Sequence, residues 1–209
     1  MRFNTESSIF QFLGMLADYT ILNIIFLITC IPIVTIGPAI TALFSVTMQN
    51  VRNEGSSVIK SYFYAFRRSF WSSLALFFVY FVVGFILIFN FSFWLTLHTA
   101  MANIALVFLI LFALLYLFSL FYIFALTARF ENTLRQTIKN SVLLALANPR
   151  QTILLSLIFI IFMALIYVSN IFRVFLMIFG FAFLAYCASF PLTKVFEKYE
   201  EIPVNSEER

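Results

Sequence analysis

The chain has 209 residues, of which 63% are hydrophobic, 20% aromatic and only 11% charged, and its formal net charge is +4 at pH 7. Soluble domains carry about 25% charged residues, so this sequence has too little polar material to cover a water-facing surface. The composition excludes a soluble enzyme, a disordered chain and a disulfide-stapled secreted module, and it predicts a single integral membrane domain over residues 1–209.

The first apolar segment runs from Tyr19 to Val51 without a charged residue, which is too long for one membrane-spanning helix and short for two. Pro32 and the pair Gly37-Pro38 interrupt it, and a proline disfavours helical geometry at the residue before it. We predict one span over residues 18–36, a break, and an amphipathic interfacial helix over residues 39–53. A re-entrant hairpin of two half-helices is the alternative, because broken helices occur at membrane depth in transporters.

The rest of the chain contains further long runs without charge, the longest between Arg68 and Arg129. Crossing ~30 Å of hydrocarbon takes about 20 residues of helix, so this run holds two spans joined by a turn at residues 97–100. The predicted later spans cover residues 71–94, 103–126, 152–168 and 174–192. These runs lack the alternation of barrel strands, so the sequence predicts an all-α polytopic membrane bundle of about five transmembrane helices.

Two segments between the spans, residues 57–70 and 129–147, carry apolar residues at spacings of three and four. The apolar stripes are Ile59, Phe63, Phe66 and Phe70 in the first and Phe130, Leu134, Ile138 and Val142 in the second. Basic residues lie elsewhere on these segments or just after them: Lys60, Arg67, Arg68, Arg135, Lys139 and Arg150. We predict cytoplasmic interfacial helices whose cations lie near the anionic headgroups of the lipid bilayer. They anchor the bundle, or they form a surface for a partner.

The two interfacial segments resemble halves of an internal repeat. Ala65-Phe66-Arg67-Arg68 precedes one apolar hairpin, and Ala147-Asn148-Pro149-Arg150 precedes the other, with Asn148-Pro149 ending the second interfacial helix. A repeat of this kind predicts two parallel hairpins related by an axis along the membrane normal.

The distribution of basic residues predicts the orientation. All of them except Arg2 and Arg173 fall in the loops after the first and third spans or in the C-terminal tail. By the positive-inside rule this face is cytoplasmic. With five spans, the N-terminus lies outside and the C-terminus inside.

Candidate binding residues gather around the break in the first segment: Asp18, Asn23, Pro32, Thr35, Gly37, Pro38 and Thr41. We expect Asp18 to lie at the start of the first helix, where a carboxylate complements the positive end of the helix dipole. Asn23 lies deeper and is expected to form hydrogen bonds between helices. Thr35, Gly37 and Thr41 either allow close helix approach or line a small polar pocket.

No motif in the sequence indicates catalysis. The sequence has no paired carboxylates, no Cys–His or Ser–His arrangement and no phosphate-binding glycine loop. Cys30 and Cys187 fall within predicted spans and are expected to be buried thiols, and the single His98 lies in an outer turn without further metal ligands. We expect no enzyme activity, no cofactor, no metal and no nucleic-acid partner.

A longer pattern resembles the YesL-like family of bacterial integral membrane proteins, a domain of unknown function. The resemblance begins with residues 17–23, Ile31-Pro32-Ile33-Val34-Thr35-Ile36-Gly37-Pro38 and residues 41–43, and it continues through residues 62–68, 133–135, 148–150 and 195–199. Its most specific part is Pro-Ile-Val-Thr-Ile-Gly. Pro38 departs from the family pattern, in which a small residue is commoner, and this departure makes the break after Gly37 sharper.

The resemblance implies a multi-pass protein of the bacterial plasma membrane, found mostly in Gram-positive bacteria and often encoded beside sugar ABC-transporter components. It implies a non-enzymatic role accessory to a carbohydrate ABC transporter, with the permease subunit as partner. The alternative is a small facilitator or channel for a neutral solute such as a sugar, with its site at the break. An ion-coupled carrier is less favoured, because the ionisable residues lie at or near the ends of the predicted spans.

Overall fold

The computed structural model describes residues 8–54, 57–97, 99–168 and 170–200, and these residues contain helices and no strand, so the all-α prediction is confirmed. The helices are α1 (Ser8–Cys30), α2 (Ile36–Val51), α3 (Val58–Arg68), α4 (Phe70–Leu95), α5 (Ala100–Arg129), α6 (Leu134–Ala147), α7 (Pro149–Val168), α8 (Asn170–Phe175) and α9 (Phe181–Glu200). A 3₁₀ turn, η1 (Ile33–Thr35), precedes α2, and a π-helical turn, η2 (Leu176–Gly180), precedes α9.

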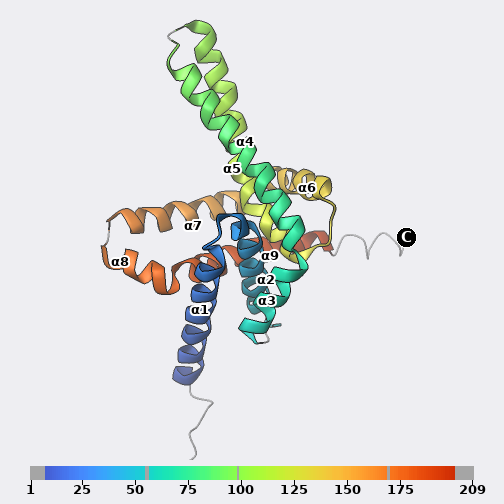
Figure 1. The fold of residues 1–209 in the computed structure, drawn as a ribbon, viewed down its shortest axis with the longest axis vertical. Coiled ribbons are helices and arrows are strands. Elements are labelled where there is room, and N and C mark those ends of the chain that lie inside the picture. The colour runs from blue at the N-terminus through green and yellow to red at the C-terminus, as the bar shows by residue number, and fades with distance from the viewer. Residues whose placement is uncertain (1–7, 55–56, 98, 169, 201–209) are drawn as a thin grey trace, which may run out of the picture.

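The helix α2 occupies the centre of the fold and contacts α1, α3, α4, α5 and α9 (Figure 1). Every residue from Gly37 to Met48 is buried except Ile40. The prediction of an interfacial helix over residues 39–53 is therefore wrong. The faces of α2 carry small residues, which allow neighbouring helices to approach closely on several sides: Gly37, Ala39, Thr41, Ala42 and Ser45.

Residues 18–51 belong to two helices that form a hairpin, so the prediction of a single crossing is wrong. The alternative, a re-entrant hairpin of two half-helices, is closer, but α1 has 23 residues and is not a half-helix. The helix α1 ends at Cys30, and Pro32 is exposed in the connection, so no continuous helix covers residues 18–36. The Thr35 hydroxyl lies 2.6 Å from the carbonyl oxygen of Thr29 and 2.7 Å from that of Pro32, to which it donates. These bonds satisfy carbonyl groups that the interrupted helix leaves free.

The helix α1 also begins earlier than expected. It starts at Ser8, ten residues before Asp18, because the residues between them continue the apolar helical sequence. Asp18 is therefore an exposed residue in the middle of the helix, and the prediction that it complements a helix N-terminus is wrong.

Close packing between α2 and α4 depends on Gly37. A Cβ atom at this position would lie 2.6 Å from the carbonyl oxygen of Ser73 and 2.7 Å from Cβ of Phe77. The Ser73 hydroxyl donates to Oγ1 of Thr41 at 2.8 Å, and the Thr41 hydroxyl donates to the carbonyl oxygen of Gly37 at 3.1 Å. The glycine thus brings two helices into contact where their hydroxyl groups bond to each other.

Five helical stretches are long and apolar enough to cross a membrane: Ile33–Val51, Phe70–Leu95, Ala100–Arg129, Pro149–Val168 and Asn170–Glu200. The first of them centres on α2, whereas α1 contributes a shorter apolar stretch, Gly14–Cys30. The chain is therefore organised as three hairpins, α1–α2, α4–α5 and α7 with α8 and α9, linked by the short helices α3 and α6. The predicted turn residue His98 lies outside the described residues.

The two longer hairpins point in different directions. Figure 1 shows the tip of α4–α5 at the top of the molecule, while α7 and α8 project to the left. The predicted repeat about an axis along the membrane normal requires parallel hairpins, and these two hairpins are not parallel. The prediction of a repeat is therefore wrong. The Ser69 and Asn148 side chains each donate to the carbonyl oxygen four residues earlier, where one helix ends and the next begins.

The linking helices expose their cations and part of their apolar stripes. Ile59, Phe63 and Leu134 are exposed, and so are all six predicted interfacial basic residues, namely Lys60, Arg67, Arg68, Arg135, Lys139 and Arg150. The buried face of α6 instead carries the small residues Thr137, Ser141 and Ala145, in a helix that packs against α5. This helix ends at Ala147 with Asn148 as its cap, as predicted.

Replacing Gly37 by alanine should destabilise the protein by about 1–3 kcal/mol, because the added methyl group meets the backbone of α4 and the helices must separate. The matched control is Gly14→Ala on α1, where a Cβ has no neighbour within 4 Å among the described residues. Thermal unfolding of both purified variants in a neutral detergent measures the difference. Equal melting temperatures for the two variants would contradict the close packing of α2 on α4.

Candidate functional site

A cavity of about 620 Å³ lies where the C-terminal ends of α2, α3 and α5 meet. The cavity contains basic, acidic and hydroxyl side chains, and a few apolar side chains such as Met48 and Phe130 complete its wall. Its ionisable lining residues are Arg52, Arg68, Arg129, Glu131, Glu200 and Tyr64. We call this space the arginine cavity.

Each of the three arginines lies at the C-terminal end of a helix. Arg52 is the C-cap of α2, Arg68 is the last residue of α3, and Arg129 is the last residue of α5. The last carbonyl groups of a helix carry partial negative charge, and a cation at this end is stabilising. Because the three helix ends meet, an arrangement that is favourable for each helix separately concentrates positive charge in one place.

Each arginine is paired with a glutamate. Arg52 lies 2.8 Å from Glu54, and the guanidinium group of Arg68 donates to Oε1 of Glu131 at 2.6 and 2.8 Å. Arg129 donates from Nε and Nη2 to the two carboxylate oxygens of Glu200. The Arg129 side chain is only 7% exposed. This buried bidentate pair therefore fixes the end of α9 against the end of α5.

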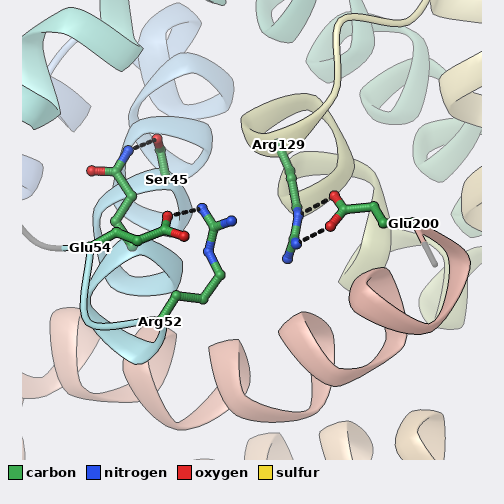
Figure 2. Close-up of polar contacts among 6 residues, drawn as sticks. Ser45, Arg52, Glu54, Arg129 and Glu200 are labelled. Atoms are coloured by element: carbon green, nitrogen blue, oxygen red, sulfur yellow. Dashed lines mark hydrogen bonds and ion pairs between the residues drawn. The ribbon is translucent and has the colours of Figure 1, made fainter. Parts of the chain in front are cut away.

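Two N–H groups in the cavity have no acceptor. Among the described residues, Nε of Arg52 and Nη1 of Arg129 are buried and make no hydrogen bond. Figure 2 shows the two guanidinium groups facing each other, with Glu54 on the outer side of one and Glu200 on the outer side of the other. A buried donor without an acceptor is costly, and such groups are uncommon in folded proteins.

Burial also determines the pKa of Tyr62, which lies on the inner face of α3. Its hydroxyl lies 2.6 Å from Oγ1 of Thr29, so α3 is tied to α1 as well as to α2. Desolvation raises the pKa of Tyr62, and the hydrogen bond to Thr29 offsets this only in part. The phenol is therefore neutral at physiological pH and serves as a structural hydrogen-bonding group.

The seven residues predicted around the break do not line the arginine cavity. They also do not line a second, more open cavity, which is formed by α2 and α9 near Glu54 and Lys194. Gly37, Pro38 and Thr41 are buried in the packing of α2, whereas Asp18 and Pro32 are exposed and Thr35 is half-buried in the connection. Of the predicted basic residues, Arg68 alone is among those that line the arginine cavity.

Asn23 is fully buried and forms hydrogen bonds between helices, as the sequence predicts. Its amide nitrogen donates to the carbonyl oxygen of Met177 at 2.8 Å, and its amide oxygen accepts from the backbone N–H groups of Phe181 and Ala182 at 3.0 and 3.1 Å. These three residues lie in and just after the π-helical turn η2. A π-helical turn disturbs the regular backbone bonding, and Asn23 provides partners for the groups it displaces.

Sequence reasoning missed the most buried part of the arginine cavity. Arg52, Arg129 and Glu200 are far apart in the chain and have no common motif. The sequence offers only a weaker indication than a motif. A basic residue stands at the end of each of three helices, where an apolar run also ends. Within the described residues, no group of three His, Cys, Asp or Glu side chains could hold a metal ion.

The fold is that of a multi-pass α-helical membrane protein. Residues 19–91 are similar to a family described as "Protein of unknown function, DUF624", and this match covers the second half of α1, all of α2 and α3, and most of α4. The match includes Gly37, Arg52 and Arg68, whereas Arg129 and Glu200 lie beyond it. No curated protein and no solved structure matches the chain.

Replacing Asn23 by leucine should destabilise the fold by about 1–3 kcal/mol, because the backbone N–H groups of Phe181 and Ala182 lose the acceptor that Asn23 provides. Asn90→Leu is the matched control, since the Asn90 amide bonds to the carbonyl oxygen of Ile86 in its own helix. Thermal unfolding in detergent measures both. An Asn23→Leu variant as stable as the control would show that these bonds contribute little.

Proposed function

We propose that this chain is a non-enzymatic membrane protein that acts as an accessory to a transporter, with the permease subunit of a carbohydrate ABC transporter as its partner. The observation that carries the proposal is the way in which the polar side chains of the helices are hydrogen-bonded. Many of the described hydroxyl and amide groups at the helix contacts bond to one another across helices, while large apolar side chains cover the outside. A protein built in this way is suited to packing against lipid and other helices.

The internal bonds connect all three hairpins. Thr41 bonds to Ser73, Thr47 lies 2.8 Å from Ser189, and Tyr122 lies 2.9 Å from Thr152. Tyr80 bonds to Ser119 at 3.0 Å. A path for a sugar needs polar groups that are free to bind the solute. Because these groups are occupied, we place the accessory role ahead of the facilitator.

The arm formed by α7 and α8 is the surface that we assign to the partner. Its exposed apolar residues include Tyr167, Ile171 and Val174, and Figure 1 shows the arm extending away from the other hairpins. Arg173 donates from Nε to the carbonyl oxygen of Ile166 at 3.0 Å, so a side chain of α8 caps the end of α7. An apolar arm whose outer part extends from its own bundle offers exposed surface to helices of another protein.

We further propose that the arginine cavity and the two linking helices face the cytoplasm of a bacterial cell, as the positive-inside rule requires. The expectation of an outside N-terminus depended on a single crossing over residues 18–36. The helices α1 and α2 form a hairpin (Figure 1), and we propose that α1 crosses the membrane as a sixth span, which puts the start of α1 on the same face as the end of α2. We therefore place both termini in the cytoplasm.

Crosslinking in native membranes followed by gentle solubilisation and affinity purification should recover a permease subunit with the tagged protein. The double variant Ile171→Ala with Val174→Ala should recover less, because it removes side chains of the partner-facing arm. Ile104→Ala with Val107→Ala on the α4–α5 hairpin is the matched control, since those residues are also exposed.

Repeated recovery of the protein alone would contradict the accessory role. Uptake of sugars by liposomes that contain only this protein would favour the facilitator instead.

Single-cysteine labelling tests the orientation. In a background in which Cys30 and Cys187 are serine, a membrane-impermeant maleimide applied to intact cells should label Thr96→Cys and should not label Lys139→Cys. The two positions lie at opposite ends of α5 and its neighbours, so they report the two membrane faces. Asn4→Cys should also stay unlabelled if both termini are cytoplasmic. Labelling at Lys139 would overturn the orientation, and labelling at Asn4 would restore the single crossing.

A further inference from the structure

We propose that the arginine cavity binds a phosphate group, held between the guanidinium groups of Arg52 and Arg129. The ligand class is a phosphate ester, supplied either by the headgroup of a membrane lipid or by a small soluble molecule. This site is independent of the accessory role, since the argument uses only the geometry of the cavity.

The first observation is the pair of unused donors. Arg129 is almost completely buried, yet one of its terminal nitrogens has no acceptor among the described residues, and the same is true of Nε in Arg52. Both residues line the same cavity. A buried guanidinium group normally uses its donors, because an unpaired buried N–H group loses its hydration without compensation. An anion with several acceptor oxygens in this cavity can offer partners to both arginines.

The second observation is the placement of charge. Figure 2 shows that the carboxylates lie on the outer sides of Arg52 and Arg129, so the inner sides of two like charges face each other. The carboxylate groups are also more accessible to solvent than Arg129, with side-chain exposures of 55% for Glu54 and 42% for Glu200. Solvent screens exposed charges more than buried ones, so the charge of Arg129 is screened less than that of its partner Glu200. An anion between the arginines removes their repulsion.

The third observation concerns size and lining. A phosphate bridges two guanidinium groups well, because its oxygens accept bonds from several directions at once. The cavity of about 620 Å³ is much larger than phosphate alone and falls within the usual range of small-molecule sites, so it has space for an organic group on the phosphate. Ser72 offers a hydroxyl group, and Met48 and Phe130 offer apolar contacts.

The test uses the full-length protein in a neutral detergent, with native mass spectrometry and thermal unfolding as readouts. The soluble probes are inorganic phosphate and glycerol 3-phosphate. The lipid probe is phosphatidylglycerol, with phosphate-free diacylglycerol as its control. Binding of phosphatidylglycerol alone identifies a headgroup site, whereas binding of the soluble probes identifies a site for a soluble ester.

In either case Arg52→Gln should weaken binding roughly tenfold or more, because it removes a charged donor from the phosphate. Arg150→Gln is the matched control, since Arg150 is an exposed basic residue outside the cavity lining, and it should bind as the unmodified protein does. Arg129→Gln should also weaken binding, but it breaks the ion pair with Glu200 and can disturb the fold. Arg52→Gln is therefore the decisive variant, because its partner Glu54 is largely exposed.

Glu54→Gln gives a result of the opposite sign. Removing this carboxylate frees Arg52 from its competing partner and should make phosphate binding tighter. The proposal is overturned if none of the phosphate probes binds, or if Arg52→Gln and Arg150→Gln weaken binding equally. Loss of permease recovery with phosphate binding intact would count against the accessory role alone, so the two proposals fail separately.

Discussion

The contact that organises this protein is the backbone of α2 lying directly against α4. It is possible because position 37 has no side chain, and the carbonyl group of Ser73 occupies the space that a Cβ would need. Once α2 is held there, its small residues present several faces to α1, α3, α5 and α9. In a membrane, apolar side chains gain little from leaving lipid, so close van der Waals contact and internal hydrogen bonds decide which helices associate. The central helix is therefore the one richest in small and hydroxyl residues.

The same physics explains which features could be predicted from the sequence. Long runs such as those of α4 and α5 were identifiable because length and lack of charge are sufficient to indicate a membrane-spanning helix. The amphipathic pattern was misleading for α2, and the buried face of α6 was not anticipated. In α6 the predicted stripe included Leu134, which is exposed, whereas Ser141 is fully buried. Patterns learned from water-soluble proteins assign the large apolar residues to the interior, and in lipid the small ones can take that place.

Neither the arginine cavity nor the partners of Asn23 could be derived from spacing. Asn23 bonds to residues more than 150 positions away, and it does so where a π-helical turn displaces backbone groups. Arg129 pairs with Glu200 across 71 positions of sequence. Local sequence explains why each arginine stands at a helix end, since cations are favourable there. It contains no information on which helix ends meet, because that depends on the packing of α2.

The arginine cavity connects the three hairpins through one polar cluster. Arg52 belongs to the α1–α2 hairpin, Arg129 to α4–α5, and Glu200 to the last helix of the third hairpin. The helices α2 and α9 are also joined by the bond between Thr47 and Ser189. An anion bound between the two arginines would therefore hold α2 and α5 together directly and α9 through Glu200. Because a ligand stabilises the state that binds it, occupation of the cavity would favour the arrangement in which the three hairpins are joined, including the base of the arm assigned to the partner. The proposed ligand site and the proposed partner surface are then linked through α9, which contacts both α2 and α7.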